Sequence, residues 1–82
     1  GYNVPYVRAL QAVSGRVVDE NGSALPGVSV TVKGTTVGTN TDGKGNYSLQ
    51  LPAHASVLVF SFVGYVTQEM PVSNAIINTV LV

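Results

Sequence analysis

Several residue types that mark common functional classes are absent or scarce in this sequence. It has no cysteine, so it can form no disulfide, no redox centre and no thiolate metal site. Four basic and four acidic residues are its only charged groups, and the formal net charge is zero. Without a basic excess to neutralise phosphates, we expect no nucleic-acid partner. No apolar run approaches the roughly 20 residues that span a bilayer, so we expect no membrane insertion by this domain.

The scarcity of charge also bears on how such a domain is used. A chain with zero net charge has little colloidal repulsion, so we expect a tethered part of a larger protein rather than a free secreted domain. Residues 1–12 show neither the basic end nor the apolar stretch of a signal peptide. The sequence stops at residues 80–82 within a strand-like run, and Gly1 is compatible with a scar from tag removal. Our hypothesis is that the chain is an excised piece.

Residues that favour β-structure dominate what is present. Valine, threonine and isoleucine account for 25 of the 82 residues. Alternation of apolar and polar residues with a period of two recurs along the chain, and it is clearest in residues 28–33, where three valines alternate with two hydroxyl side chains and a lysine. The pattern predicts seven short strands, within residues 13–18, 28–33, 35–41, 47–51, 57–63, 65–72 and 76–82.

Seven short strands separated by turns are typical of a β-sandwich. Two packed sheets bury apolar faces that a single sheet would leave exposed to water. Residues 1–12 precede this pattern, show no clear period and contain Pro5, which is excluded from a central strand. We therefore predict an N-terminal arm over residues 1–12 and one β-sandwich domain over residues 13–82.

Two polar segments predict tight hairpin turns. They are residues 19–22 (DENG) and residues 42–46 (DGKGN), where glycine supplies left-handed backbone conformations. Residues 57–63 (VLVFSFV) are apolar at both alternating sets of positions and end at Gly64. They predict a central strand that is buried on both faces.

No set of residues in the sequence forms a convincing catalytic or metal-binding group. His54 is the only histidine and lies in a predicted loop, so we interpret it as a solvated side chain rather than a general base. Residues 40–51 only distantly resemble a calcium loop, because Leu51 occupies the position where the loop requires a bidentate glutamate. We predict no catalytic residues, no metal ligands and no cofactor.

Exposed tyrosines could in principle stack on sugars, since carbohydrate sites commonly present aromatic faces. The candidates are Tyr2, Tyr6, Tyr47 and Tyr65. Tyr47 shares a predicted strand face with Leu49 and is expected in the core, and Tyr65 is expected to be packed as well. Tyr2 and Tyr6 lie in the predicted arm, and the sequence has no tryptophan, so this interpretation is the weaker one.

The order of several blocks resembles a known family. The blocks are residues 13–19 (VSGRVVD), 25–35 (LPGVSVTVKGT), 38–49 (GTNTDGKGNYSL) and 58–65 (LVFSFVGY). Over residues 13–82 the chain resembles the carboxypeptidase regulatory-like domain. The segments KGT at 33–35 and FSFVGY at 60–65 are similar to those of the domain variant found at the N-terminus of SusC/RagA-type TonB-dependent outer-membrane transporters.

The resemblance implies an all-β fold, a transthyretin-like (prealbumin-like) Greek-key β-sandwich of about seven strands. It also implies a position on the periplasmic side of the outer membrane, ahead of the plug and barrel of a transporter for glycan or peptide nutrients. The partners it implies are that plug and barrel, and the TonB energy-coupling machinery. The resemblance carries no catalytic residues to this chain.

The sequence is compatible with two functional hypotheses. The first is a non-catalytic accessory module of such a transporter, acting through protein–protein contacts, with an exposed sheet edge available for strand addition. The second is a carbohydrate- or peptide-binding accessory module of a surface protein or peptidase. A transthyretin-like hydrolase would require several convergent histidines, whereas this chain has one.

Overall fold

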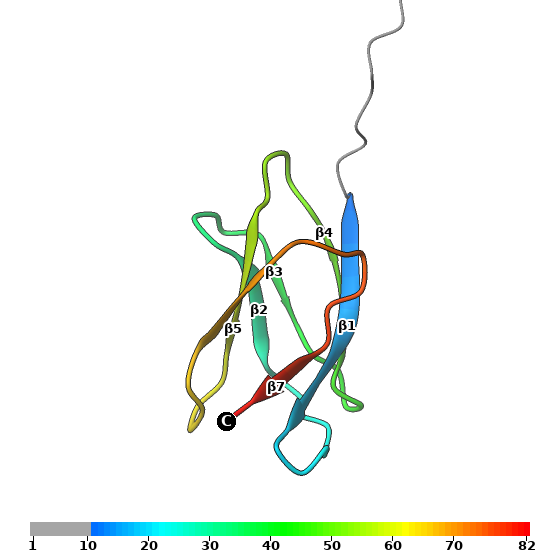
Figure 1. Cartoon of the computed structure of the whole chain (residues 1–82), viewed down its shortest axis with the longest axis vertical. Coiled ribbons are helices and arrows are strands. Elements are labelled where there is room, and N and C mark those ends of the chain that lie inside the picture. Colours follow the sequence, from blue (N-terminus) through cyan, green and yellow to red (C-terminus); the bar gives the residue numbers. More distant parts are fainter. Residues whose placement is uncertain (1–10) are drawn as a thin grey trace, which may run out of the picture.

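The strand pattern in the sequence produces two facing sheets. The computed structural model describes residues 11–82, which contain seven strands (Figure 1). Their bounds are β1 Ala12–Asp19, β2 Ser29–Val32, β3 Gly38–Asn40, β4 Asn46–Gln50, β5 Val57–Ser61, β6 Gln68–Pro71 and β7 Thr79–Leu81. Within residues 11–82 there is no helix that could cross a membrane. The all-β sandwich of seven strands expected from the sequence is confirmed.

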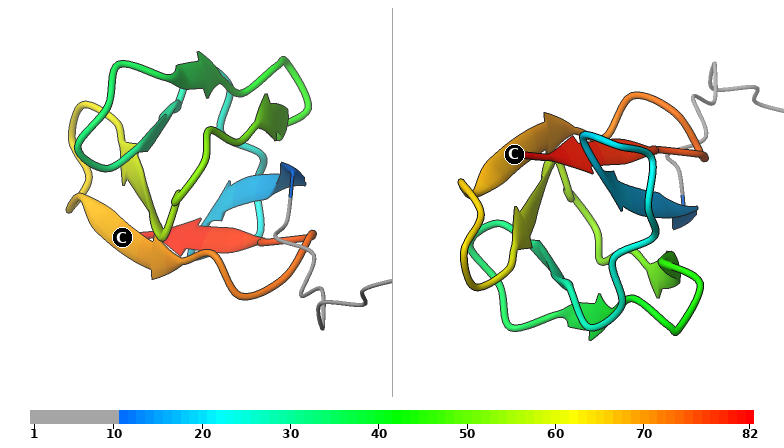
Figure 2. Two further views of the ribbon diagram at one scale, coloured as in Figure 1. Left: turned by 90° about the horizontal axis from the view of Figure 1, so that it is seen from above. Right: turned by 90° about the horizontal axis from the view of Figure 1, so that it is seen from below.

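The two sheets contain three and four strands. The smaller sheet has the order β4-β1-β7 and the larger sheet has the order β3-β2-β5-β6. All neighbouring strands are antiparallel except β1 and β7, which are parallel. Seen along its long axis, the domain shows the two sheets on opposite sides of a central space (Figure 2). The first and last strands of the domain therefore lie side by side.

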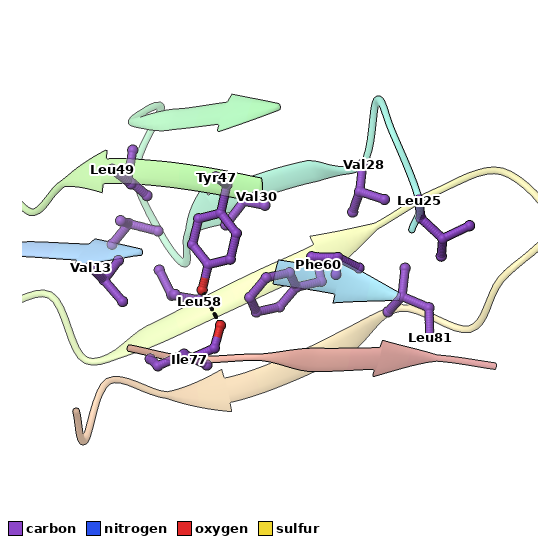
Figure 3. Packing of buried hydrophobic residues seen from close by; sticks show 12 residues of the cluster. Val13, Leu25, Val28, Val30, Tyr47, Leu49, Leu58, Phe60, Ile77 and Leu81 are labelled. Atoms are coloured by element: carbon purple, nitrogen blue, oxygen red, sulfur yellow. Dashed lines mark hydrogen bonds between the residues drawn. The ribbon is translucent and has the colours of Figure 1, made fainter. Parts of the chain in front are cut away.

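The core fills the space between the inner faces of the sheets (Figure 3). The larger sheet contributes Val30 and Val32 from β2 and Leu58 and Phe60 from β5, all buried. The smaller sheet faces them with further buried side chains: Val13, Val17, Tyr47, Leu49 and Leu81. Burying each of these side chains contributes about 1.5–3 kcal/mol. The rings of Tyr47 and Phe60 meet edge to face across the two sheets, with centroids 5.5 Å apart at 74°.

The prediction for residues 57–63 is right about position and wrong about burial. Strand β5 is an inner strand, between β2 and β6. Only one of its faces is buried, however, because Val57 and Val59 are partly exposed and Val63 lies beyond the strand at the surface. The reason is architectural: among residues 11–82 no third layer covers the outer face of the larger sheet.

The two predicted turns have the same local structure. In each five-residue loop, one carboxylate oxygen of the first aspartate accepts hydrogen bonds from the third and fifth backbone N–H groups, at 2.9–3.0 Å. These loops are residues 19–23 and 42–46. The fourth residue, Gly22 or Gly45, has a positive φ of 82° or 78° and donates its N–H to the aspartate carbonyl. Asx turns of this kind explain why each loop begins with aspartate and has glycine at its fourth position.

The second of these loops corrects the hairpin prediction. It leads from β3 to β4, and these strands belong to different sheets. The loop therefore turns a corner of the sandwich. Thr41 supports this corner from the inside, since its buried hydroxyl donates to the Leu25 carbonyl at 2.6 Å and accepts from the Val28 N–H at 2.9 Å. One threonine thus joins the β3–β4 corner to the segment that carries the chain from β1 to β2.

Candidate functional site

The residues with acid–base chemistry are dispersed in the structure. His54 is exposed and has a positive φ of 65°, in the loop between β4 and β5. It lines a hollow of about 280 Å³, and none of the other described residues that line this hollow carries an ionisable side chain. No group of three histidine, cysteine or carboxylate side chains that could hold a metal is present in the part of the chain that the structure describes. The described residues of this hollow therefore offer no acid–base pair to a substrate.

Three of the four carboxylates have structural partners. Asp19 and Asp42 bind the backbone N–H groups of their own loops. Glu69 forms a surface ion pair with Lys33 at 2.9 Å across the outer face of the larger sheet. An exposed pair of this kind contributes at most about 1 kcal/mol. The loop that distantly resembles a calcium site is thus held together by hydrogen bonds to its own backbone.

Two of the four tyrosines proposed for sugar stacking can be placed. Tyr47 is buried, as expected, and desolvation raises the pKa of its hydroxyl to about 12. Tyr65 is half-buried and stacks on Phe62, with centroids 5.9 Å apart at 26°. Neither ring is freely open for stacking on a sugar. Tyr2 and Tyr6 lie outside the described residues.

A junction that no sequence motif indicated joins β4, β1 and the start of β7. The Tyr47 hydroxyl donates to the Ile77 carbonyl at 2.6 Å (Figure 3). Next to this bond, the Arg16 N–H donates to the Asn78 side chain at 2.9 Å. The parallel pairing of β1 and β7 is consequently interrupted between the Ser14–Ile76 bridge and the ladder that begins at Val17 and Thr79. In the sequence, the only signals for this junction are the glycine at position 15 and the tyrosine at position 47. Neither residue lies in a recognisable functional motif.

The outer strands of the two sheets differ in how well their edges are protected. Strand β6 carries Glu69 and Pro71, which discourage pairing with another strand. Strand β7 is followed by Val82, whose carbonyl accepts the Val66 N–H at 2.8 Å. Strand β3 has three residues. Strand β4 is the longest outer strand, with five residues and neither a charge nor a proline.

The hydrogen-bond register shows which groups of β4 point outward. The Val17 N–H donates to the Gly45 carbonyl, and the Leu51 N–H donates to the Gln11 carbonyl, so Gly45 and Leu51 direct their backbone groups toward the β1 side. Backbone groups alternate in direction along an antiparallel strand, so the N–H and C=O groups of Ser48 and Gln50 face away from β1. Those of Asn46 are taken by the Asp42 loop. Within residues 11–82 no strand pairs with this edge, so the candidate interaction site is this open edge, formed by the backbone of Ser48 and Gln50.

The fold and these surfaces define a small β-sandwich module with an open sheet edge. The chain belongs to the CarboxypepD_reg-like domain family, whose model matches residues 13–81. It is 46% identical over 69 residues to TonB-dependent receptor P3 and 42% identical over 73 residues to TonB-dependent receptor P39, both of Formosa agariphila. These matches cover 82% and 89% of this chain but only 7% of each relative.

A third relative agrees with this assignment, and a solved structure has a similar fold. TonB-dependent receptor SusC of Bacteroides thetaiotaomicron is 45% identical over 69 residues, which are 84% of this chain and 7% of SusC. A chain in the crystal structure of a type II cohesin–X-dockerin complex from Acetivibrio cellulolyticus superposes with a TM-score of 0.71 at 18% identity. This match covers 87% of the present chain and 56% of the other. At that identity the likeness concerns the fold alone.

Proposed function

We propose that this chain is a non-catalytic accessory module of a TonB-linked outer-membrane nutrient transporter, lying on the periplasmic side of the membrane. The observation that carries the proposal is the match to three TonB-dependent receptors at 42–46% identity, each over about 7% of the relative's length. A segment that small in a receptor is an appended module. Its nutrient, a glycan or a peptide, is handled elsewhere in the parent chain.

The geometry supports a role in protein–protein contact. Three of the four carboxylates are engaged in loops or an ion pair, and His54 faces solvent with no ionisable neighbour among the described residues of its hollow. The open backbone groups of Ser48 and Gln50 could add a strand from a partner, a common mode of peptide recognition. The partners we propose are the plug and barrel of the parent transporter and the TonB energy-coupling machinery.

A carbohydrate-binding function has less structural support. Carbohydrate sites commonly present an aromatic face beside polar groups, whereas, of the two tyrosines that the structure describes, Tyr47 is buried and Tyr65 is covered on one side by Phe62.

Two experiments on the parent receptor test the proposal. The first deletes residues 13–82 and measures nutrient uptake in cells that retain the same amount of receptor in the outer membrane. We expect reduced uptake, and unchanged uptake would contradict a transport role. The second compares protease cleavage of the module in intact cells with cleavage in cells whose outer membrane is permeabilised. Cleavage in intact cells would contradict the periplasmic position.

The open edge is tested with a matched pair of variants in the same receptor. Ser48→Pro removes the outward N–H from the edge strand, where proline is tolerated, and Ser48→Ala keeps that N–H. If a partner pairs with β4, Ser48→Pro lowers uptake and Ser48→Ala does not. Equal uptake by both variants, at equal receptor levels, would show that β4 does not recruit a partner by strand addition.

A further inference from the structure

Exposed large apolar side chains gather at one end of the sandwich. Five such residues stand out among residues 11–82, and four of them form what we call the apolar end patch: Val63, Val66, Val80 and Val82. Their exposed fractions are 92%, 64%, 51% and 48%, respectively. In Figure 1 the loop between β5 and β6 and the marked C-terminal residue lie next to each other at the lower end of the domain. A cluster of this kind on a small domain commonly marks an interaction site.

The backbone holds the patch in a defined shape. The Val66 N–H donates to the Val82 carbonyl at 2.8 Å, which joins the loop after β5 to the end of β7. The Tyr65 N–H donates to the Phe62 carbonyl, and Gly64 has a φ of 89°. These features form a tight turn that places Val63 at its tip. Val80 lies beside Val18 on the outer face of the smaller sheet.

The patch continues into a hollow on this outer face. The hollow has a volume of about 320 Å³ and is lined by Arg16, Val18, Asn78, Thr79 and Val80. Arg16 is exposed there and donates through Nε to the Lys44 carbonyl. The surface therefore combines an apolar region with one cationic group at its border. An apolar centre with a polar rim is the usual organisation of a protein–protein interface.

We propose that the apolar end patch docks the neighbouring domain of the same parent chain, an inference that rests on the proposed function. The occupant presents an apolar surface to the four valines and a hydrogen-bond acceptor or carboxylate to Arg16. In the three receptors, the segment matched by this chain is only 7% of the protein. A much larger covalently linked body is therefore available to each such module.

The size of the patch favours a tethered partner over a free one. Four valines at these exposures present roughly 300 Å² of apolar surface, at the lower end of the range for the largest patch on a monomer. A stable interface between separate proteins needs about 800 Å² from each partner, so a second copy of this chain would be held weakly. A covalent linker supplies an effective concentration in the millimolar range, at which a contact of this size is populated.

Local structure does not explain the valine at position 63. A tight turn of this type requires glycine at its third position, which Gly64 provides, and leaves the second position open to most residues. The Val63 side chain is almost fully exposed, so it adds little to the stability of the isolated fold. A solvent-exposed valine side chain is apolar and has few accessible χ1 rotamers, and both properties suit an interface.

Site-directed photo-cross-linking in the full-length receptor tests the proposal. A benzophenone side chain is placed at position 63, and a control is placed at Ile76, which is 65% exposed at the other end of the 76–82 segment. We expect cross-links from position 63 to residues of the same chain beyond residue 82, with a yield about tenfold higher than at position 76. Cross-links to a second copy or to a separate protein, or equal yields at both positions, would overturn the proposal.

A second set of variants shows whether the four valines create the contact. The variant Val63→Ser/Val66→Thr/Val80→Thr/Val82→Thr keeps β-branched residues at three positions and removes the apolar surface. In the full receptor that carries these four substitutions, we expect hydrogen exchange at residues 62–67 to be about tenfold faster, because the contact no longer protects them. Ile76→Thr is the control and leaves this exchange unchanged. Unchanged exchange in the patch variant would overturn the proposal.

The proposed function and the docking proposal fail in different ways. If the module is not part of transport, deleting residues 13–82 leaves uptake unchanged whatever the cross-links show. If the module serves transport but the patch is not its docking surface, deletion lowers uptake while position 63 gives no intrachain cross-link.

Discussion

The Tyr47 hydroxyl donates a hydrogen bond to the carbonyl of Ile77, with 2.6 Å between the two oxygens. Tyr47 belongs to β4 and Ile77 precedes β7, so the bond spans the smaller sheet past the strand between them, β1. Its path crosses Gly15, the cross-strand partner of Tyr47. A Cβ atom at Gly15 would lie 1.9 Å from the Ile77 carbonyl oxygen. The tyrosine, the glycine and the carbonyl therefore depend on one another.

Removing the Tyr47 hydroxyl is expected to destabilise the fold. Tyr47→Phe keeps the ring against Phe60 but leaves the Ile77 carbonyl without this donor, which costs about 1–3 kcal/mol. Urea denaturation followed by circular dichroism measures the change in unfolding free energy. Tyr65→Phe is the control, since no hydrogen bond of the Tyr65 hydroxyl occurs within residues 11–82, and it should change stability little. Equal effects of both variants would contradict the role assigned to the Tyr47–Ile77 bond.

Stability is expected to fall at high pH because of Tyr47. Burial raises the pKa of this hydroxyl from 10.0 to about 12, so between these values the unfolded chain loses a proton that the folded chain retains. The folded form then binds more protons than the unfolded form, and unfolding becomes easier as pH rises, by up to about 1.4 kcal/mol per pH unit. Below pH 10 Tyr47 is protonated in both the folded and the unfolded chain, and its contribution to the free energy of unfolding is fully present.

The pH dependence is measured by comparing the wild type with Tyr47→Phe. Urea midpoints are taken from pH 8 to pH 11.5, where the lysines also titrate and give both proteins a common background. The difference in stability between the two proteins should shrink above pH 10, where Tyr47 begins to ionise in the unfolded state. A constant difference across this range would argue against a desolvated tyrosine.

Two buried threonines are expected to respond oppositely to the same substitution. The Thr79 hydroxyl is buried and has no hydrogen-bond partner among residues 11–82. Thr79→Val replaces it with a methyl group of similar size, so we expect about 0.5–2 kcal/mol of stabilisation. Thr41→Val removes a hydroxyl that both donates and accepts a hydrogen bond, so we expect a loss of about 2–3 kcal/mol. Thermal denaturation of both variants measures whether each is more or less stable than the wild type. A Thr79→Val variant less stable than the wild type would refute the predicted stabilisation.

Glycine substitutions are expected to separate backbone strain from steric collision. Gly22 and Gly64 have φ values of 82° and 89°, and a Cβ atom at either position would meet nothing within 4 Å. Valine there costs about 1–2 kcal/mol, through the left-handed backbone alone. Gly15→Ala is expected to cost more, because its Cβ atom would collide with the Ile77 backbone. Melting temperatures rank the three variants, and a Gly15→Ala protein as stable as either valine variant would contradict the tight junction.

Much of the fold could be predicted because the information is local. Period-two alternation located the strands, and the conformational demands of the Asp19 and Asp42 loops located both turns. The strand predicted over residues 57–63 was also located, although β5 ends at Ser61 rather than at Gly64. The burial of its second face was predicted wrongly, since an apolar run does not reveal how many layers pack on a sheet. The resemblance to the carboxypeptidase regulatory-like domain identified the family, and the match over residues 13–81 confirms it.

The interaction surfaces could not be predicted in this way. Ser48 is one of several polar residues in alternating strands, and its outward backbone groups follow from the pairing of β4 with β1 alone. Val63, Val66, Val80 and Val82 are indistinguishable in the sequence from the buried valines. They form one patch only because the end of β7 lies beside the loop after β5.

The class of fold, the positions of the turns and the absence of cysteine chemistry follow from the amino-acid sequence alone, because they depend on neighbouring residues and on composition. Three-dimensional folding establishes which strands share a sheet, that the Asp42 loop turns between sheets, and that Tyr47 reaches Ile77 over Gly15. It also establishes which valines remain at the surface. These features depend on contacts between residues far apart in the chain, and strand order and register, which bring such residues together, are properties of the whole fold.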